Sequence, residues 1–325
     1  MLNLKIKISL IFFISIVNYV FLHLIHDANW ITLVEASFDV ANRTPHWRVN
    51  QSRLMGPILL KLITLFGFIS EQWALRLFMM FFVTFNNLLL AVCLSNMTNS
   101  KQKILNTLII FNALLIISQD VWLYVWDFID ISFFIFYGFI LFKEEYLKYL
   151  VPINFLHIFN RESALIMAVF FLLLIYTKDK NFTKLFKNSY VIGLIFNLTF
   201  GVLYTYFSRK ILFIRQSDYT GGGQDLENNF LGGNWVTPLY NYNSLYNGET
   251  LANTLILLSL LLVFIFILKN YKSFESVQKN LSFGVILNIL PVFIFGIFTE
   301  TRQYFPSLVL LTYLIFSKIN LKQER

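Results

Sequence analysis

The sequence predicts an all-α fold: a polytopic integral membrane protein with about ten transmembrane helices and additional external surface helices. Of its 325 residues, 57% are hydrophobic and only 14% are charged, whereas soluble domains carry about 25% charged residues. The apolar residues gather in long uncharged runs such as LILLSLLLVFIFIL, and none of these runs alternates as a barrel strand does. We expect residues 1–325 to form a single membrane domain.

The first apolar run follows Lys5 and Lys7, as the hydrophobic part of a signal peptide would, but no small-residue cleavage site follows it. We therefore expect this run to remain in the protein as its first transmembrane helix. The only cysteine, Cys93, lies inside a later apolar run, which excludes intrachain disulfides and thiolate metal sites.

Lysines set the expected topology. The predicted spans are residues 8–25, 74–95, 104–118, 128–142, 149–160, 161–177, 188–207, 251–268, 281–298 and 304–317. With the amino terminus in the cytoplasm and every span crossing, most of the 26 lysines and arginines fall on the cytoplasmic side, as the positive-inside rule requires. The net charge of +8 is then explained by a lipid bilayer as partner, and no nucleic acid is expected.

Two apolar segments need separate treatment. Residues 54–70 could form a further span, but that crossing would move the lysines of the next cytoplasmic linkers outside. We expect instead an interfacial helix within a first external loop, residues 26–73. Residues 149–177 are expected to break at 160–162 into two short spans, because two adjacent ionised side chains are costly at mid-membrane.

The arginines have the opposite distribution to the lysines. Every arginine except Arg325 falls on the predicted outer side or in the outer half of a span. A guanidinium presents a planar fork that matches phosphate or carboxylate, and it stays charged when partly buried. The pattern predicts an outward-facing site for a phosphate-bearing ligand. The alternative is that these arginines pair with external acids or extend to lipid head groups.

Acidic residues lie at the same outer positions. In chain order these acids include Asp27, Asp127, Asp130, Glu162 and Glu300. Asp127 and Asp130 are three residues apart and so share one helix face, while Glu162 and Glu300 each lie near an arginine. Ionisable residues at membrane depth mark functional sites by default, although ion pairs can also be structural. We predict one polar cavity cut into the outer leaflet.

A second external loop, residues 208–250, is rich in Gly, Asn, Tyr and Trp. Its aromatic rings and amides suit carbohydrate, and its glycines would permit a mobile lid. Anchoring of Trp and Tyr at the membrane interface explains the same composition equally well. The triple glycine at 221–223 lacks the GK[ST] of a phosphate loop.

A family resemblance begins directly after the first span. There the chain reads DANW (27–30), then SRLMGPILLKLITLFG (52–67), then SEQWALRL (70–77). This order of an acid-bearing loop, a Pro-Leu-rich surface helix ending in Gly and an Arg-Leu pair resembles the GT-C glycosyltransferases, membrane enzymes that take sugars from polyprenyl-phosphate donors. The segment ETRQYFP (300–306) is similar to a Glu-x-Arg-aromatic-x-Pro turn of some members. The chain departs from the family at Ala28, where a second acid is typical, which weakens the case for a metal.

The resemblance implies an inverting transfer of sugar from a polyprenyl-phosphate donor to a glycan, lipid or protein acceptor. No nucleotide would be needed, and we expect no metal and no cofactor. It implies Asp27 as the base, with Asp127 or Asp130 orienting the acceptor. A cationic cradle would stabilise the leaving phosphate. The implied substrate-binding residues are Arg53, Arg76, Arg161, Glu162, Glu300 and Arg302.

Other functions remain open at this point. An O-antigen-type polysaccharide polymerase carries an arginine-rich loop late in its chain, and Arg209 and Arg215 begin the second external loop. A transporter or flippase of lipid-linked sugar would use the same cavity without a base, and internal repeats would favour it; none is evident. An assembly subunit would have no use for clustered external charges. The Lys-, Asn- and Ile-rich composition favours a bacterial inner membrane, with the site facing outward. An ER membrane would follow the same topology argument.

Overall fold

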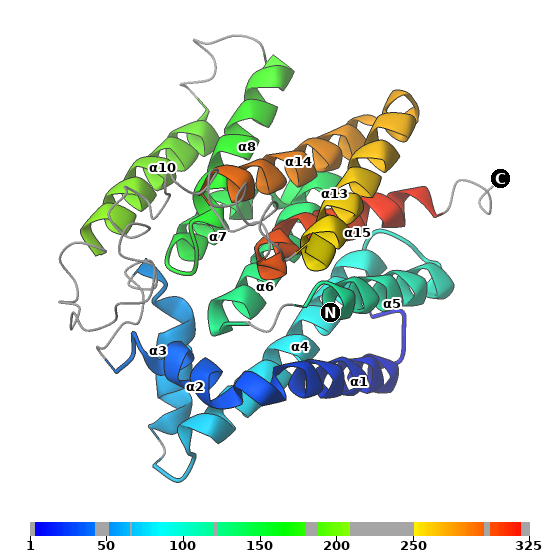
Figure 1. Cartoon of the computed structure of the whole chain (residues 1–325). Helices are drawn as coiled ribbons and strands as arrows, with labels where there is room; N and C mark the ends of the chain where they lie inside the picture. The colour runs from blue at the N-terminus through cyan, green and yellow to red at the C-terminus, as the bar shows by residue number, and fades with distance from the viewer. Residues whose placement is uncertain are drawn as a thin grey trace.

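The computed structural model describes residues 4–42, 52–65, 67–119, 123–179, 188–208, 250–295 and 300–319, and the second external loop predicted at 208–250 lies almost wholly outside these ranges. Within them the chain is helical and contains no strand (Figure 1). The longer helices are α1 (Ile8–His26), α4 (Glu71–Ser95), α5 (Lys101–Ile117), α6 (Val125–Phe142), α8 (Ser163–Asp179), α10 (Ser189–Phe207), α13 (Thr250–Asn270), α14 (Ser276–Phe295) and α15 (Phe305–Lys318). The shorter ones are η1 (Asp27–Asn29), α2 (Trp30–Phe38), α3 (Met55–Thr64), η3 (Glu144–Tyr149), α7 (Leu150–Ile158), η6 (Tyr271–Ser273) and η7 (Thr301–Tyr304).

Each predicted apolar span coincides with one helix of this set. Among the residues that the structure describes, 5 helical segments are long and apolar enough to cross a membrane: Ile8–Phe38, Glu71–Ser95, Val125–Phe142, Ser189–Phe207 and Leu255–Ser273. The all-helical fold is therefore confirmed within the described ranges, and the candidate spans are consistent with a membrane protein. The number of crossings stays a prediction.

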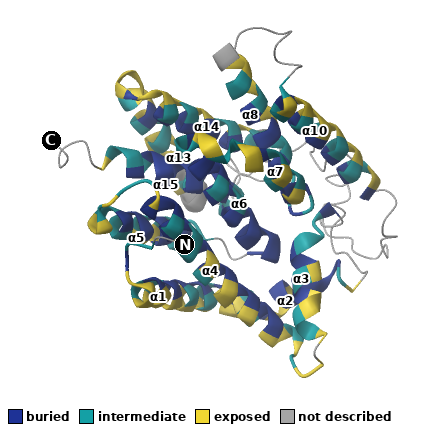
Figure 2. Ribbon diagram, turned by 180° about the vertical axis from the view of Figure 1, so that it is seen from behind, coloured by how far each residue is buried: buried dark blue, intermediate teal, exposed yellow. Residues whose placement is uncertain are grey.

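Helix α6 forms the centre of the bundle. Nearly all of its side chains are buried, and it packs against α3, α4, α7, α14 and α15 (Figure 2). By contrast, α1, α10 and α13 leave one side apolar and exposed, with Phe13 on α1 64% exposed and Leu262 on α13 66% exposed. Exposed apolar surface of this extent is what a lipid-facing helix requires.

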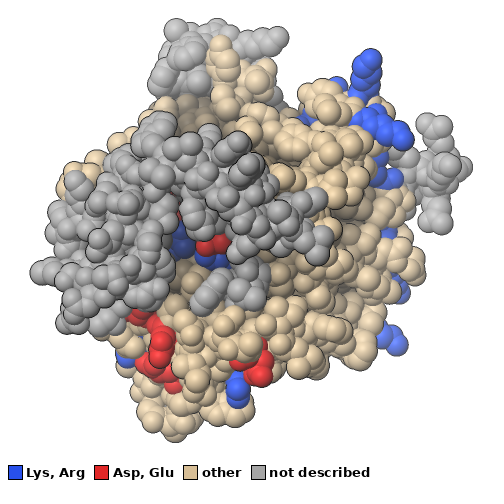
Figure 3. Space-filling view, in the orientation of Figure 1, with Lys and Arg blue, Asp and Glu red and all other residues tan. Residues whose placement is uncertain are grey.

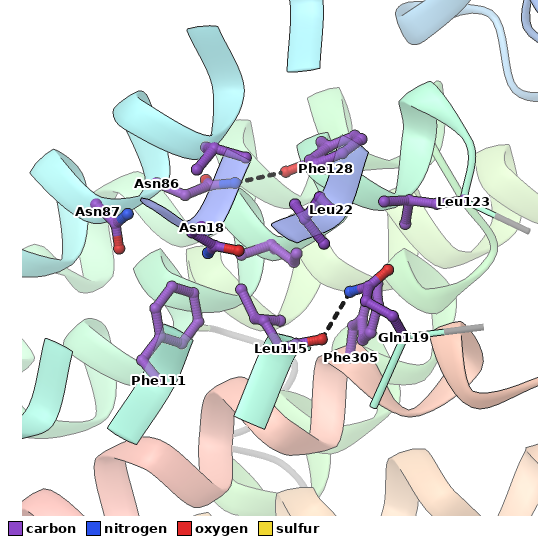
Figure 4. Close-up of a pocket in the computed structure, with 12 residues that line it drawn as sticks. Asn18, Leu22, Asn86, Asn87, Phe111, Leu115, Gln119, Leu123, Phe128 and Phe305 are labelled. Atoms are coloured by element: carbon purple, nitrogen blue, oxygen red, sulfur yellow. Dashed lines mark hydrogen bonds between the residues drawn. The ribbon is translucent and has the colours of Figure 1, made fainter. Parts of the chain in front are cut away.

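Amide side chains join α1, α4 and α5 inside the apolar bundle. Asn112 donates to Asn87 Oδ1 at 2.7 Å, Asn87 donates to Ser15 Oγ at 3.0 Å, and Asn18 donates to Asn112. Figure 4 shows the small pocket that Asn18, Asn87 and Phe111 help to line between these helices and α6. Because lipid offers no hydrophobic drive for helix association, such hydrogen bonds and close packing hold the helices together.

The stretch 149–177 breaks where expected. Helix α7 ends at Ile158 and α8 begins at Ser163, which confirms the predicted interruption at 160–162. The break is tied to the first loop, because the backbone N–H of Met55, at the start of α3, donates to the carbonyl of Phe159 at 3.0 Å. Segment 54–70 accordingly contains a separate short helix, α3.

Lysines gather at one end of the bundle. Lys318 donates to Ser273 at 2.9 Å, Lys103 lies 4.3 Å from the ring centroid of Phe316, and Lys5 donates to the turn that follows α4. These contacts bring the start of α1, the α4–α5 turn, the α13–α14 turn and the end of α15 together. Figure 3 shows blue atoms along this side of the molecule. We call it the lysine end.

We predict that Gly138→Ala destabilises the protein by about 1–3 kcal/mol, because overpacking a well-packed core costs that much. A Cβ at Gly138 would lie 2.3 Å from a ring carbon of Tyr313. That ring is fully buried, and its hydroxyl donates to the carbonyl of Ile135 at 2.9 Å. Thermal unfolding in detergent measures the effect, with Val17→Ile, a methylene added on exposed α1, as control. Equal melting temperatures for the two variants would contradict this packing.

Candidate functional site

Asp127 and Asp130 lie one turn apart at the beginning of α6, away from the lysine end. Both side chains are fully buried. The Asp127 carboxylate caps the helix, since its Oδ2 accepts the backbone N–H of Tyr124 at 2.9 Å. A carboxylate at this position also interacts favourably with the helix dipole. The two acids predicted at the start of the fourth span therefore form a buried pair on one face of α6.

Arg161 compensates both carboxylates. It lies in the break between α7 and α8, and its Nη1 is 2.8 Å from Asp127 Oδ1 and 3.4 Å from Asp130 Oδ2. Next to it, Asn160 donates to the carbonyl of Trp126 at 2.9 Å and so fixes the break against α6. Buried ions of opposite sign at hydrogen-bonding distance keep each other charged, and removing either partner is costly.

A buried histidine adds a second set of contacts to Asp130. His157 Nε2 bonds Asp130 Oδ1, and Ser163 Oγ donates to the same oxygen at 2.7 Å. On the other ring nitrogen, His157 Nδ1 lies 3.1 Å from the hydroxyl of Tyr137, which accepts from Asn154 at 3.2 Å. The Tyr137 oxygen accepts a hydrogen bond from Asn154, so its own hydroxyl proton is free to be donated to His157 Nδ1. With Nδ1 as an acceptor, we assign the imidazole proton to Nε2, which faces Asp130. Asp130 is thus held at both oxygens.

Two further arginines surround the buried pair. Arg53 Nη2 is 3.3 Å from Glu162 Oε2, and its guanidinium lies 5.2 Å from the ring centroid of Trp126. Arg302 Nη1 is 3.7 Å from Asp127 Oδ2 and its Nη2 is 2.8 Å from Glu300 Oε2.

The ring of Tyr124 lies 4.4 Å from the Arg302 guanidinium. Burial raises the pKa of the Tyr124 phenol, and the charge of Arg302 opposes that rise. The phenol is therefore neutral where its ring packs against the Arg302 guanidinium.

The cluster has a buried floor and a more open rim. Asp127 and Asp130 are 0% exposed, whereas the Glu162 and Glu300 side chains are 23% and 24% exposed. Figure 3 shows blue and red atoms side by side near the middle of this view. An anion that enters at the rim would meet guanidinium groups already oriented by carboxylates, at a place where water is limited.

Most of the site residues predicted from sequence meet here. The cluster joins Arg53, Asp127, Asp130, Arg161, Glu162, Glu300 and Arg302. Two predicted residues are not in contact with it. Asp27 is exposed in η1, and Arg76 lies beside Trp30 and Trp73.

Sequence reasoning missed His157, Ser163, Tyr137 and Asn154. The one available signal was a histidine inside an apolar run just before an Arg-Glu pair. The residues that the structure describes include no group of three or more His, Cys, Asp or Glu side chains able to hold a metal ion.

Comparison with known proteins finds no family model, no curated protein and no solved structure that matches this chain.

Proposed function

We propose that this protein is an inverting glycosyltransferase that moves a sugar from a polyprenyl-phosphate donor to a glycan, lipid or protein acceptor at the outer membrane face. The observation that carries the proposal is the cluster itself. Three arginines and a buried carboxylate pair converge at the end of an apolar helical bundle opposite its lysines. A lipid-linked phosphate suits such a site, because its phosphate would bind the arginines and its apolar tail would lie along the apolar helices.

The reaction asks three things of the protein. The acceptor oxygen attacks the anomeric carbon, the bond from that carbon to the phosphate oxygen breaks, and polyprenyl phosphate leaves with the electron pair. Cations aimed at the leaving oxygen stabilise the charge that develops there; Arg53, Arg161 and Arg302 are suited to this. Inversion follows from a single displacement. A carboxylate must take the proton of the acceptor hydroxyl.

Asp27 is the best-suited proton acceptor. Its side chain is exposed and makes no hydrogen bond or ion pair within the described residues. Asp127 and Asp130 have their oxygens occupied by Arg161, His157, Ser163 and a backbone N–H. We therefore assign Asp27 as base and the buried pair to holding Arg161 in place.

The position of the lysines supports one orientation in the membrane. By the positive-inside rule the lysine end faces the cytoplasm, so the cluster opens on the opposite side, at the outer face of a bacterial inner membrane. A donor carried on polyprenyl phosphate needs no nucleotide there, because the phosphodiester already supplies the energy of transfer.

A transporter of lipid-linked sugar is the second candidate. The carboxylates of Asp127 and Asp130 already accept hydrogen bonds from Arg161, Ser163 and a backbone N–H. This favours a transporter, because a binding cavity needs oriented charges but no base.

The test is a transfer assay on purified protein with radiolabelled polyprenyl-phosphate sugars. We expect wild type to release polyprenyl phosphate and Arg53→Gln to lose about ten- to hundredfold in kcat/KM, the value of a charge-assisted hydrogen bond. Lys61→Gln is the matched control, because Lys61 is an exposed cation on nearby α3 that donates to Asn42 at 3.1 Å.

Each outcome decides between the candidates. Tight donor binding without turnover, weakened by Arg53→Gln alone, would replace the transferase by the transporter. Equal losses in both variants would remove Arg53 from the site. Absence of both binding and turnover across the donor panel would reject both functions.

A further inference from the structure

Arg76 forms a second polar site, apart from the cluster. It lies on the second turn of α4, where its guanidinium carbon is 4.9 Å from the ring centroid of Trp73 and 5.3 Å from that of Trp30. Trp30 begins α2 and is 5% exposed, while Trp73 is 58% exposed. No hydrogen bond, ion pair or ring contact among the described residues joins Arg76 to the cluster.

The charge of Arg76 is not compensated by the part of the protein that the structure describes. Arg53, Arg161 and Arg302 each have a carboxylate within 3.3 Å, whereas Arg76 has no acidic partner in the described ranges and its buried Nε makes no hydrogen bond. The indole N–H of Trp30 is also buried without a hydrogen-bond partner. A cation and a polar N–H held against apolar rings are costly unless an external group completes them.

The surroundings of Arg76 are apolar and exposed. Around this site α1, α2 and α4 expose large apolar side chains: Phe21 48%, Leu24 67%, Ile31 66%, Leu77 41%, Met80 44% and Phe81 60%. The far end of α4 runs into the turn that Lys5 contacts, so Arg76 lies at the end of the bundle opposite the lysine end. Indole rings beside a cation at the end of a membrane helix are typical of head-group depth.

We propose that Arg76, with Trp30 and Trp73, binds the phosphate diester of an anionic bilayer phospholipid. The guanidinium fork matches two non-bridging phosphate oxygens, and its single charge balances a head group with one net negative charge. The exposed apolar side chains continue from the site as a surface for acyl chains. In the proposed function, on which this step rests, the donor phosphate is held by the three paired arginines of the cluster. The lipid bound at Arg76 is therefore a component of the bilayer rather than the donor.

The experiment measures lipid binding to the purified full chain by native mass spectrometry, with phosphatidylglycerol and phosphatidylcholine of identical acyl chains. We expect wild type and Lys61→Gln to bind phosphatidylglycerol alike. Arg76→Gln should bind it about tenfold more weakly, and Arg76→Lys should fall between. Binding of phosphatidylcholine should differ little among these variants, because its choline already neutralises the phosphate.

A second variant guards against misfolding. Trp73→Leu removes an exposed ring and keeps Arg76, and we expect it also to weaken phosphatidylglycerol binding. Unchanged binding in both variants would overturn the proposal and leave Arg76 as an interfacial anchor. If Arg76→Gln instead weakens binding of a polyprenyl-phosphate sugar and leaves phosphatidylglycerol binding intact, the site belongs to the donor and the proposal also fails. Neither readout requires catalytic turnover, so the result is separate from that of the transfer assay.

Discussion

Arg161→Ala is expected to lower the free energy of unfolding by about 3–5 kcal/mol, the cost of breaking a buried ion pair by removing one partner. The guanidinium of Arg161 contacts both Asp127 and Asp130. Without it, the partners that the described residues offer to these two carboxylates, both 0% exposed, are His157, Ser163, the more distant Arg302 and a backbone N–H. Thermal unfolding in detergent measures the loss, and transfer activity should vanish with it.

Two further variants separate charge from geometry. Arg161→Lys keeps one positive charge but loses the planar fork that spans both carboxylates, so stability should return in part while activity stays low. The pair Asp127→Asn with Arg161→Gln removes both charges and should be more stable than Arg161→Ala. If Arg161→Ala melts like wild type, water already compensates the two aspartates and the buried pair is misassigned.

Asp27→Asn is expected to reduce kcat by about 10²–10⁴-fold, the usual contribution of a general base. The amide keeps the size of the side chain and removes its ability to take a proton. Because the Asp27 side chain is exposed and has no hydrogen bond or ion pair among the described residues, the melting temperature and donor binding should not change. The radiolabelled transfer assay, with donor binding measured separately, tests this split.

Glu35→Gln is the matched control for Asp27→Asn. Glu35 lies on α2, eight residues further along the chain, and is also an exposed carboxylate. Full activity in Asp27→Asn would move the base to Glu300 or Glu162, the partly exposed carboxylates on the rim of the cluster. Loss of donor binding in Asp27→Asn would show that Asp27 binds the donor and would remove its assignment as the base that takes the acceptor proton.

The helices were predictable because their cause is local. Each apolar run must satisfy its backbone internally in lipid, and only a helix does so within one segment. The break between α7 and α8 was predictable for the same reason, since Arg161 and Glu162 are ionised in the middle of an otherwise apolar stretch. Neither inference required knowledge of which helix is adjacent to which.

The composition of the site was only partly predictable, because it depends on packing. Arginines and acids were grouped by their position along the membrane normal, which brought Arg53, Asp127 and Arg302 together correctly. The same argument could not separate Arg76, which lies at the same end but on the side of α4 next to α2. His157 was missed because its partners, Asp130 and Tyr137, come from another helix.

The order in which the cluster can assemble during synthesis follows from its contacts. Arg161 is synthesised 34 residues after Asp127, and Glu162 is synthesised 109 residues after Arg53. At about 5–20 residues per second, each partner therefore follows only after seconds of translation. Until then each charge lies in a nascent chain entering the bilayer without its counter-ion. We therefore expect a chain that ends before Arg161 to leave the Asp127 and Asp130 carboxylates without their guanidinium partner, and such fragments to be less stable than the full chain.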